Sequence, residues 1–130
     1  MEFEFKKTNP STDKRKQESQ KIREKYPDRV PVICEKDPKS KMKSIDKTKY
    51  LVPNDLTVSQ FSYIIRKRLE LDKSSALFLL VSGKHSITGG KKLIFKINLD
   101  SALSEIYEKY ADKDDGFLYI SYTSEITWGN

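Results

Sequence analysis

The 130-residue sequence contains a single cysteine, Cys34, and a single histidine, His85. One cysteine cannot form an internal disulfide, and these two residues alone cannot make up a structural zinc site. Long apolar runs are also missing, because the longest, residues 76–81, is far shorter than the roughly 20 residues of a membrane-spanning helix. Residues 1–5 lack the pattern of a signal peptide. We therefore expect one cytosolic domain that holds no metal and no cofactor.

Positive charge is concentrated in the first part of the chain. Residues 1–49 carry 15 Lys or Arg against 9 Asp or Glu, whereas residues 50–130 carry 10 of each. A basic surface can bind nucleic acid, an anionic membrane or an acidic protein, or it can be a solvated helix face. Phe3, Phe5 and Tyr26 are sparse in this part and no nucleic-acid motif is present, so we expect no nucleic-acid partner. An acidic partner such as tubulin stays open.

The first predicted helix is strongly polar. Ser11 can cap its start and Pro27 closes it, and Ile22 is its only apolar residue. Most of its basic side chains, including Arg15, are expected in water. We therefore predict an N-terminal helical extension, residues 1–27, that lies on the core without belonging to it.

Four strands and two further helices are predicted after this extension. They are strands at 29–35, 47–53, 76–81 and 117–122, a helix after Thr57 between the second and third strands, and a helix at 103–110 before the last strand. Thr57 and Gln60 form a capping box, and apolar residues follow at helical spacing. Segment 82–98 has no clear order, although Leu93, Ile94 and Phe95 can form a short strand or contact a partner. This order of elements is that of an α+β, ubiquitin-like β-grasp.

Three segments carry a resemblance to a known family. They are residues 21–33 (KIREKYPDRVPVI), 49–61 (KYLVPNDLTVSQF) and 115–120 (DGFLYI). In sequence and order they closely resemble the GABARAP and light-chain family of autophagy modifiers, and the GABARAP branch most. The resemblance implies a β-grasp core at 28–124, an inserted loop at 82–98 and a conjugation tail at 125–130.

The resemblance also implies a modifier and not an enzyme. A cysteine protease would remove Asn130, and activating and conjugating enzymes would pass the carboxylate of Gly129 to the amine of phosphatidylethanolamine. Glycine suits this chemistry because a tail without a Cβ fits a narrow enzyme cleft. Trp128 stands where the family usually has Phe or Tyr. The free protein would be cytoplasmic, and the lipid-anchored form would lie on autophagosome membranes, support their expansion and be released by the same protease.

A second implied activity is the binding of cargo receptors through short aromatic-x-x-aliphatic peptides, which add as a strand to the exposed edge of the second strand. The residues that would receive the aromatic side chain are Glu18, Ile22, Pro31, Ile33, Lys49, Leu51 and Phe117. Those that would receive the aliphatic side chain are Tyr50, Val52, Pro53, Leu56, Phe61 and Ile64. Acidic residues beside the motif would be attracted by Lys47, Lys49 and Arg68. A second docking face of the family maps to Ala76, Leu77, Phe78 and Leu79.

Other interpretations stay open from the residues alone. Core packing explains Leu56, Phe61 and Ile64 without any ligand. An enzyme would need a nucleophile beside a base, and no pattern joins Cys34 to His85, so a buried thiol is the better interpretation. The remaining alternative is a β-grasp adaptor that is never conjugated and binds acidic partners through its basic N-terminal helix.

Overall fold

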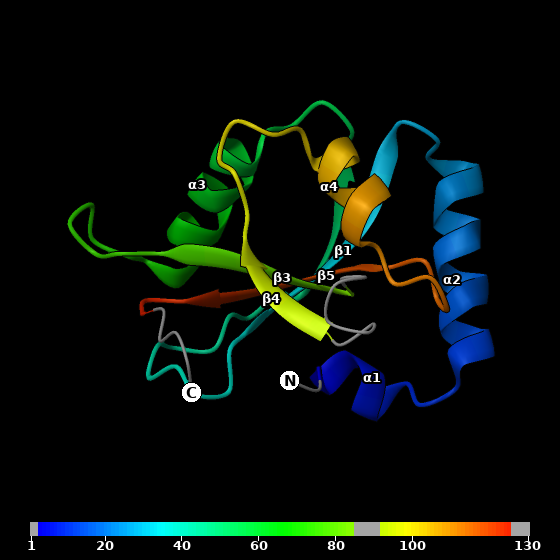
Figure 1. The fold of residues 1–130 in the computed structure, drawn as a ribbon, viewed down its shortest axis with the longest axis horizontal. Coiled ribbons are helices and arrows are strands. Elements are labelled where there is room, and N and C mark those ends of the chain that lie inside the picture. Colours follow the sequence, from blue (N-terminus) through cyan, green and yellow to red (C-terminus); the bar gives the residue numbers. More distant parts are fainter. Residues whose placement is uncertain (1–2, 85–91, 126–130) are drawn as a thin grey trace.

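The computed structural model describes residues 3–84 and 92–125. A mixed, 5-stranded sheet with the strand order β2-β1-β5-β3-β4 forms its centre (Figure 1). Its strands are β1 (Arg29–Lys36), β2 (Lys49–Pro53), β3 (Phe78–Lys84), β4 (Lys92–Lys96) and β5 (Leu118–Thr123). Its helices are α1 (Glu4–Thr8), α2 (Thr12–Lys25), α3 (Val58–Leu69) and α4 (Leu103–Tyr110). The predicted α+β, ubiquitin-like architecture is confirmed.

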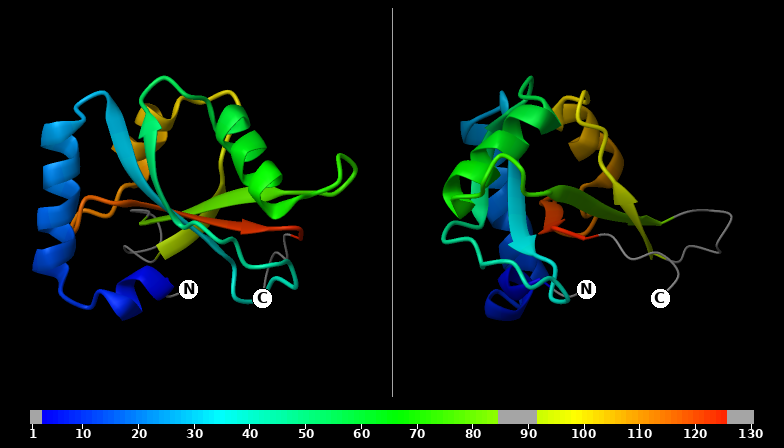
Figure 2. Two further views of the ribbon diagram at one scale, coloured as in Figure 1. Left: turned by 180° about the vertical axis from the view of Figure 1, so that it is seen from behind. Right: turned by 90° about the vertical axis from the view of Figure 1, so that its left-hand side faces the viewer.

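Both faces of the sheet are covered. Strands β1 and β5 run parallel, whereas the β1–β2, β3–β4 and β3–β5 pairs are antiparallel. Helices α3 and α4 cover one face, and α1 and α2 lie on the other (Figure 2). Side chains alternate along β1, so Val32 and Cys34 enter the larger core whereas Ile33 enters a smaller cluster under the N-terminal helices. Strand β1 is therefore buried on both sides.

The helix boundaries follow from local capping. Ser11 accepts a hydrogen bond from the backbone of Lys14, as predicted for the start of α2. Thr57 and Gln60 form the predicted capping box of α3. At the other end of α3, Glu70 has a left-handed backbone with φ 55°, and the N–H of Leu71 reaches back to the carbonyl of Arg66, which is a Schellman ending. No helix in the described ranges is long and apolar enough to cross a membrane.

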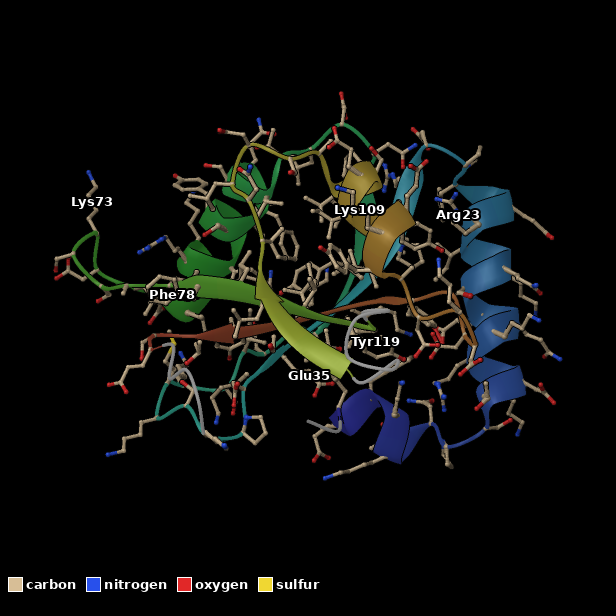
Figure 3. All side chains as sticks on the ribbon, in the orientation of Figure 1. Arg23, Glu35, Lys73, Phe78, Lys109 and Tyr119 are labelled. Carbon is tan, nitrogen blue, oxygen red and sulfur yellow. The ribbon has the colours of Figure 1, made fainter. Side chains whose placement is uncertain are left out.

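Helices α1 and α2 make more buried contacts with the rest of the domain than the sequence predicts. Helix α1 was not predicted, and its flanking Phe3 and internal Phe5 are both buried. Arg15, expected in water, is only 7% exposed, because its Nε donates a 2.8 Å hydrogen bond to the fully buried carboxylate of Asp115. Glu35 lies beside α1 and accepts the backbone N–H groups of Glu4 and Phe5 at 2.8 and 2.9 Å (Figure 3). Residues 3–25 thus belong to the folded unit.

All four predicted strands differ from the observed ones at one or both ends, by one residue in β1 and β5 and by more in β2 and β3. Strand β2 begins at Lys49 and not at residue 47, and β3 runs from Phe78 to Lys84 and not over 76–81. Part of the segment 82–98 is consequently a strand ladder where a loop is predicted, since residues 82–84 pair with residues 92–94. The alternative of a short strand around Ile94 is confirmed by β4. His85 lies outside the described residues.

Candidate peptide-binding edge

Strand β2 is the first strand of the sheet, and in the described residues it pairs only with β1. The N–H of Cys34 donates a 2.8 Å hydrogen bond to the carbonyl of Thr48, which fixes the phase of this ladder. In an antiparallel pair, residues alternate between turning both backbone groups toward the partner and turning both away. The register therefore turns Tyr50 toward β1, and it turns the N–H and C=O groups of Lys49 and Leu51 outward.

Pro31 does not remove a hydrogen bond from the β1–β2 ladder. It lies opposite Leu51, and this pair makes no hydrogen bonds between β1 and β2 because of the same alternation. The missing N–H of proline is therefore not needed on the β2 side. On the other side, the pairing of β1 with β5 begins only at Val32.

The residues predicted to receive an aromatic side chain meet between α2 and the sheet. Lys49 and Leu51 lie opposite Ile33 and Pro31 on the neighbouring strand. Across from them on α2, Ile22 packs against the cluster that contains Ile33 and Phe117. Glu18 of α2 accepts a hydrogen bond from the ammonium of Lys49, which ties the helix to the edge strand. The structure thus brings the whole predicted set to one face.

Phe5 covers part of this face, and sequence reasoning missed it. Ile33 and Phe117 have no exposed surface, and the ring of Phe5 lies edge-on against Phe117 with centroids 5.1 Å apart. The Lys49 ammonium lies 5.5 Å from the centroid of the Phe5 ring. An aromatic side chain can therefore reach Phe117 only if part of its cover, which includes Phe5, moves. Two aromatic residues close together in an otherwise polar N-terminus, Phe3 and Phe5, were the available signal.

The residues predicted to receive the aliphatic side chain divide into a buried floor and an accessible rim. Tyr50, Val52 and Phe61 are buried in the larger core, and the rings of Tyr50 and Phe61 meet edge to face with centroids 5.4 Å apart. Leu56 is half-buried against the same core. Pro53 and Ile64 are exposed. Core packing and ligand binding are therefore compatible at this side of β2.

The three predicted cations differ in their surroundings. Lys47 is exposed and lies 5.1 Å from the centroid of the Tyr50 ring. Arg68 donates to both carboxylate oxygens of Asp46 at 3.2 and 3.1 Å, and this hydrogen bonding lowers the pKa of Asp46. Lys49 is paired with Glu18. Because exposed ion pairs contribute little stability, an acidic peptide can replace Asp46 or Glu18 at small cost.

The second predicted docking face is only partly accessible. Ala76 is exposed and Leu77 and Phe78 are half-buried, but Leu79 is buried in the core. Leu79 can therefore support such a face from below and cannot itself contact a ligand without a change in β3.

The remaining predicted site residues fall outside the described part of the chain or inside the core. Trp128, Gly129 and Asn130 lie beyond Glu125, the last described residue. Cys34 is fully buried, and its burial raises the pKa of the thiol, which disfavours the reactive thiolate.

Comparison with known proteins places this geometry in context. The sequence profile of a family described as "Autophagy protein Atg8 ubiquitin like" matches residues 14–129. Autophagy-related protein 8 of Coccidioides immitis is 48% identical over 130 residues and covers 100% of both chains. The protein of the same name from Schizosaccharomyces pombe is 50% identical over 119 residues, or 92% of this chain and 88% of the relative. A crystal structure of Trypanosoma brucei ATG8 superposes with a TM-score of 0.73 at 39% identity, over 92% of each chain.

Proposed function

Because this chain belongs to the Atg8 family of ubiquitin-like autophagy proteins, we propose that Gly129 is the residue through which it is conjugated to phosphatidylethanolamine. At its C-terminal end the family profile matches through residue 129 and stops before Asn130, and this observation carries the proposal. Removal of Asn130 by a cysteine protease would expose the Gly129 carboxylate to the activating and conjugating enzymes. Two lipid chains would then give the stable membrane attachment that one chain does not.

The intact mass of the protein tests this assignment. The protein is recovered from the membrane and cytosolic fractions of its own starved cells. We expect a membrane species that lacks Asn130 and carries phosphatidylethanolamine, and we expect none for Gly129→Ala. A membrane pool that retains Asn130 and no lipid would refute it and would favour an adaptor that is never conjugated.

We further propose that β2 reads aromatic-x-x-aliphatic peptides of cargo receptors. The outward N–H and C=O groups of Lys49 and Leu51 support this role, since an extended peptide can continue the sheet through them. The free form would lie in the cytoplasm, and the lipidated form would present this edge on autophagosome membranes. Many copies on one membrane would raise the avidity of an interaction whose single contact is small.

The sharpest test removes one outward donor. Leu51→Pro deletes an N–H that the β1–β2 ladder does not use, so we expect the fold to persist and peptide affinity to fall at least about tenfold, or 1.4 kcal/mol. Leu51→Val keeps the N–H and serves as the matched control. The probe is a synthetic peptide with acidic residues before Trp-x-x-Leu, measured by fluorescence anisotropy. Equal affinity of the two variants would refute strand addition at β2.

Tyr50→Ala is unsuitable for this purpose. Tyr50 is only 6% exposed, its hydroxyl donates a 2.6 Å hydrogen bond to the carbonyl of Lys47, and its ring packs against Phe61. Truncation of such a buried ring costs about 3–5 kcal/mol, so a loss of binding would report on unfolding. The variant Leu51→Ala, without the change at Tyr50, is expected to weaken peptide binding while lipid conjugation persists.

A further inference from the structure

The described sheet has a second open edge, at the end opposite to β2. Strand β4 is last in the order β2-β1-β5-β3-β4, and in the described residues it pairs only with β3 (Figure 1). Three strands separate it from β2, so a ligand on β4 would not touch the proposed receptor-binding edge. An open edge presents a row of backbone donors and acceptors that another extended segment can use.

The register identifies which backbone groups of β4 are outward. The N–H of Ile97, directly after β4, donates a 3.1 Å hydrogen bond to the carbonyl of Leu79. Alternation along the antiparallel ladder then turns the backbone groups of Leu93 and Phe95 toward β3. The N–H and C=O groups of Lys92, Ile94 and Lys96 are outward.

The charge along this edge has one sign. Strands β3 and β4 contain no Asp or Glu, whereas lysines stand at positions 84, 92 and 96. Strand β4 begins and ends with lysine, and its first residue, Lys92, lies opposite Lys84 of β3. The equal numbers of acidic and basic residues in the second part of the chain conceal this local excess.

From this placement we propose that β4 is a second strand-addition site, which takes an extended peptide whose apolar residues are flanked by Asp or Glu. A second copy of the chain fits poorly: antiparallel pairing of β4 with itself about Ile94 would set Lys92 opposite Lys96 at both ends. Like charges directly opposite each other destabilise a strand pair, whereas opposite charges stabilise it. An acidic membrane would neutralise the positive charge of the lysines. It would, however, leave the outward N–H and C=O groups of Lys92, Ile94 and Lys96 without backbone partners.

The test exploits the alternation along β4. Ile94→Pro removes an outward N–H and leaves the donors of Leu93 and Phe95 to β3, and Ile94→Val is its matched control. The probe is a synthetic peptide of alternating valine and threonine between two pairs of glutamates, which lacks the aromatic residue that β2 would require. Titration of ¹⁵N-labelled protein is expected to move the amide resonances of Lys92, Ile94 and Lys96, and Ile94→Pro is expected to weaken binding at least about tenfold.

A charge-reversed pair keeps the proposal testable even if Ile94→Pro disturbs β4. The double variant Lys92→Glu, Lys96→Glu is expected to lose peptide binding. The control pair Lys73→Glu, Lys113→Glu changes the net charge equally at two exposed positions, and Lys73 lies on the loop before β3, far from β4 (Figure 3). Equal loss in both pairs would show that only net charge matters and would overturn the proposal.

Two further outcomes would also overturn it. Competition by a saturating Trp-x-x-Leu peptide would place the valine–threonine peptide on β2. Binding of Ile94→Pro and Ile94→Val with equal affinity would exclude strand addition. If the protein instead binds phosphatidylserine vesicles and not the peptide, and Ile94→Pro leaves this binding unchanged, the lysines of β4 serve a membrane surface.

Discussion

Asp115→Asn tests the ion pair between Arg15 and Asp115, which holds α2 against the turn before β5. Asp115 is fully buried in the turn before β5. One carboxylate oxygen accepts hydrogen bonds from Arg15 Nε at 2.8 Å and from the Tyr119 hydroxyl at 2.6 Å. The other accepts the backbone N–H of Phe117 at 2.9 Å. The asparagine variant keeps the shape of this side chain but removes its charge and replaces one acceptor with a donor.

The expected loss in the free energy of unfolding follows from the contacts that Arg15 keeps and the one that it loses. Arg15 keeps its hydrogen bonds to the carbonyl of Asn9 and to Thr12, but it loses its buried counter-ion. Removal of one member of a buried ion pair costs about 3–5 kcal/mol, because the other charge is left uncompensated. Native domains have a free energy of unfolding of about 5–15 kcal/mol. We therefore expect Asp115→Asn to remove a large part of the stability of the protein.

Urea unfolding followed by circular dichroism measures this change. Asp114→Asn is the matched control, because it makes the same chemical change at an exposed neighbouring position. We expect the control to change the free energy of unfolding by less than about 0.5 kcal/mol. Equal unfolding midpoints for the two variants would refute the conclusion that the Arg15–Asp115 pair holds α2 in place.

Three further predictions concern other parts of the molecule. Phe5→Ala should raise the affinity for Trp-x-x-Leu peptides, because a bound ring no longer has to displace Phe5 from Phe117; a lower affinity in a variant that circular dichroism shows to be folded would show that Phe5 is a wall of the site. Glu70→Gly should raise the free energy of unfolding by about 1 kcal/mol, since glycine adopts the left-handed conformation without strain; unchanged or lower stability would contradict this. Burial raises the pKa of Tyr122 from 10.0 to about 12, so its contribution to stability is full below pH 10 and is lost as the pH rises toward 12. Tyr122→Phe should therefore lose less stability over that range, as alkaline urea titrations can show.

The sequence predicts the elements whose signals are local. The capping box at Thr57 and Gln60 and the apolar spacing that follows were sufficient for α3. The edge position of β2 and the grouping of Lys49 with Leu51 were likewise predictable from alternation and the family resemblance.

Sequence-based prediction is wrong where the burial of a residue or the formation of a helix depends on a contact with a residue far away in the sequence. Arg15 looks like any solvated helix residue, and only the fold brings it to Asp115, 100 residues later in the chain. The short helix α1 has little helical preference of its own, because five residues cannot nucleate a stable helix, and it depends on the carboxylate of Glu35. Contacts with such distant residues produce no periodic pattern in the sequence.

These tertiary contacts bear directly on how peptides are distinguished. The outward groups of Lys49 and Leu51 belong to a strand that is already paired with β1, so backbone docking requires no change in the core. The aromatic side is different, because Phe5 lies over Phe117 and is held by α1, whose backbone is anchored by Glu35. Under the proposed strand addition, a peptide that lacks a large aromatic residue would gain the docking along β2 but not enough energy to displace Phe5. Selection among receptor peptides should therefore depend more on the stability of α1 than on the edge strand itself.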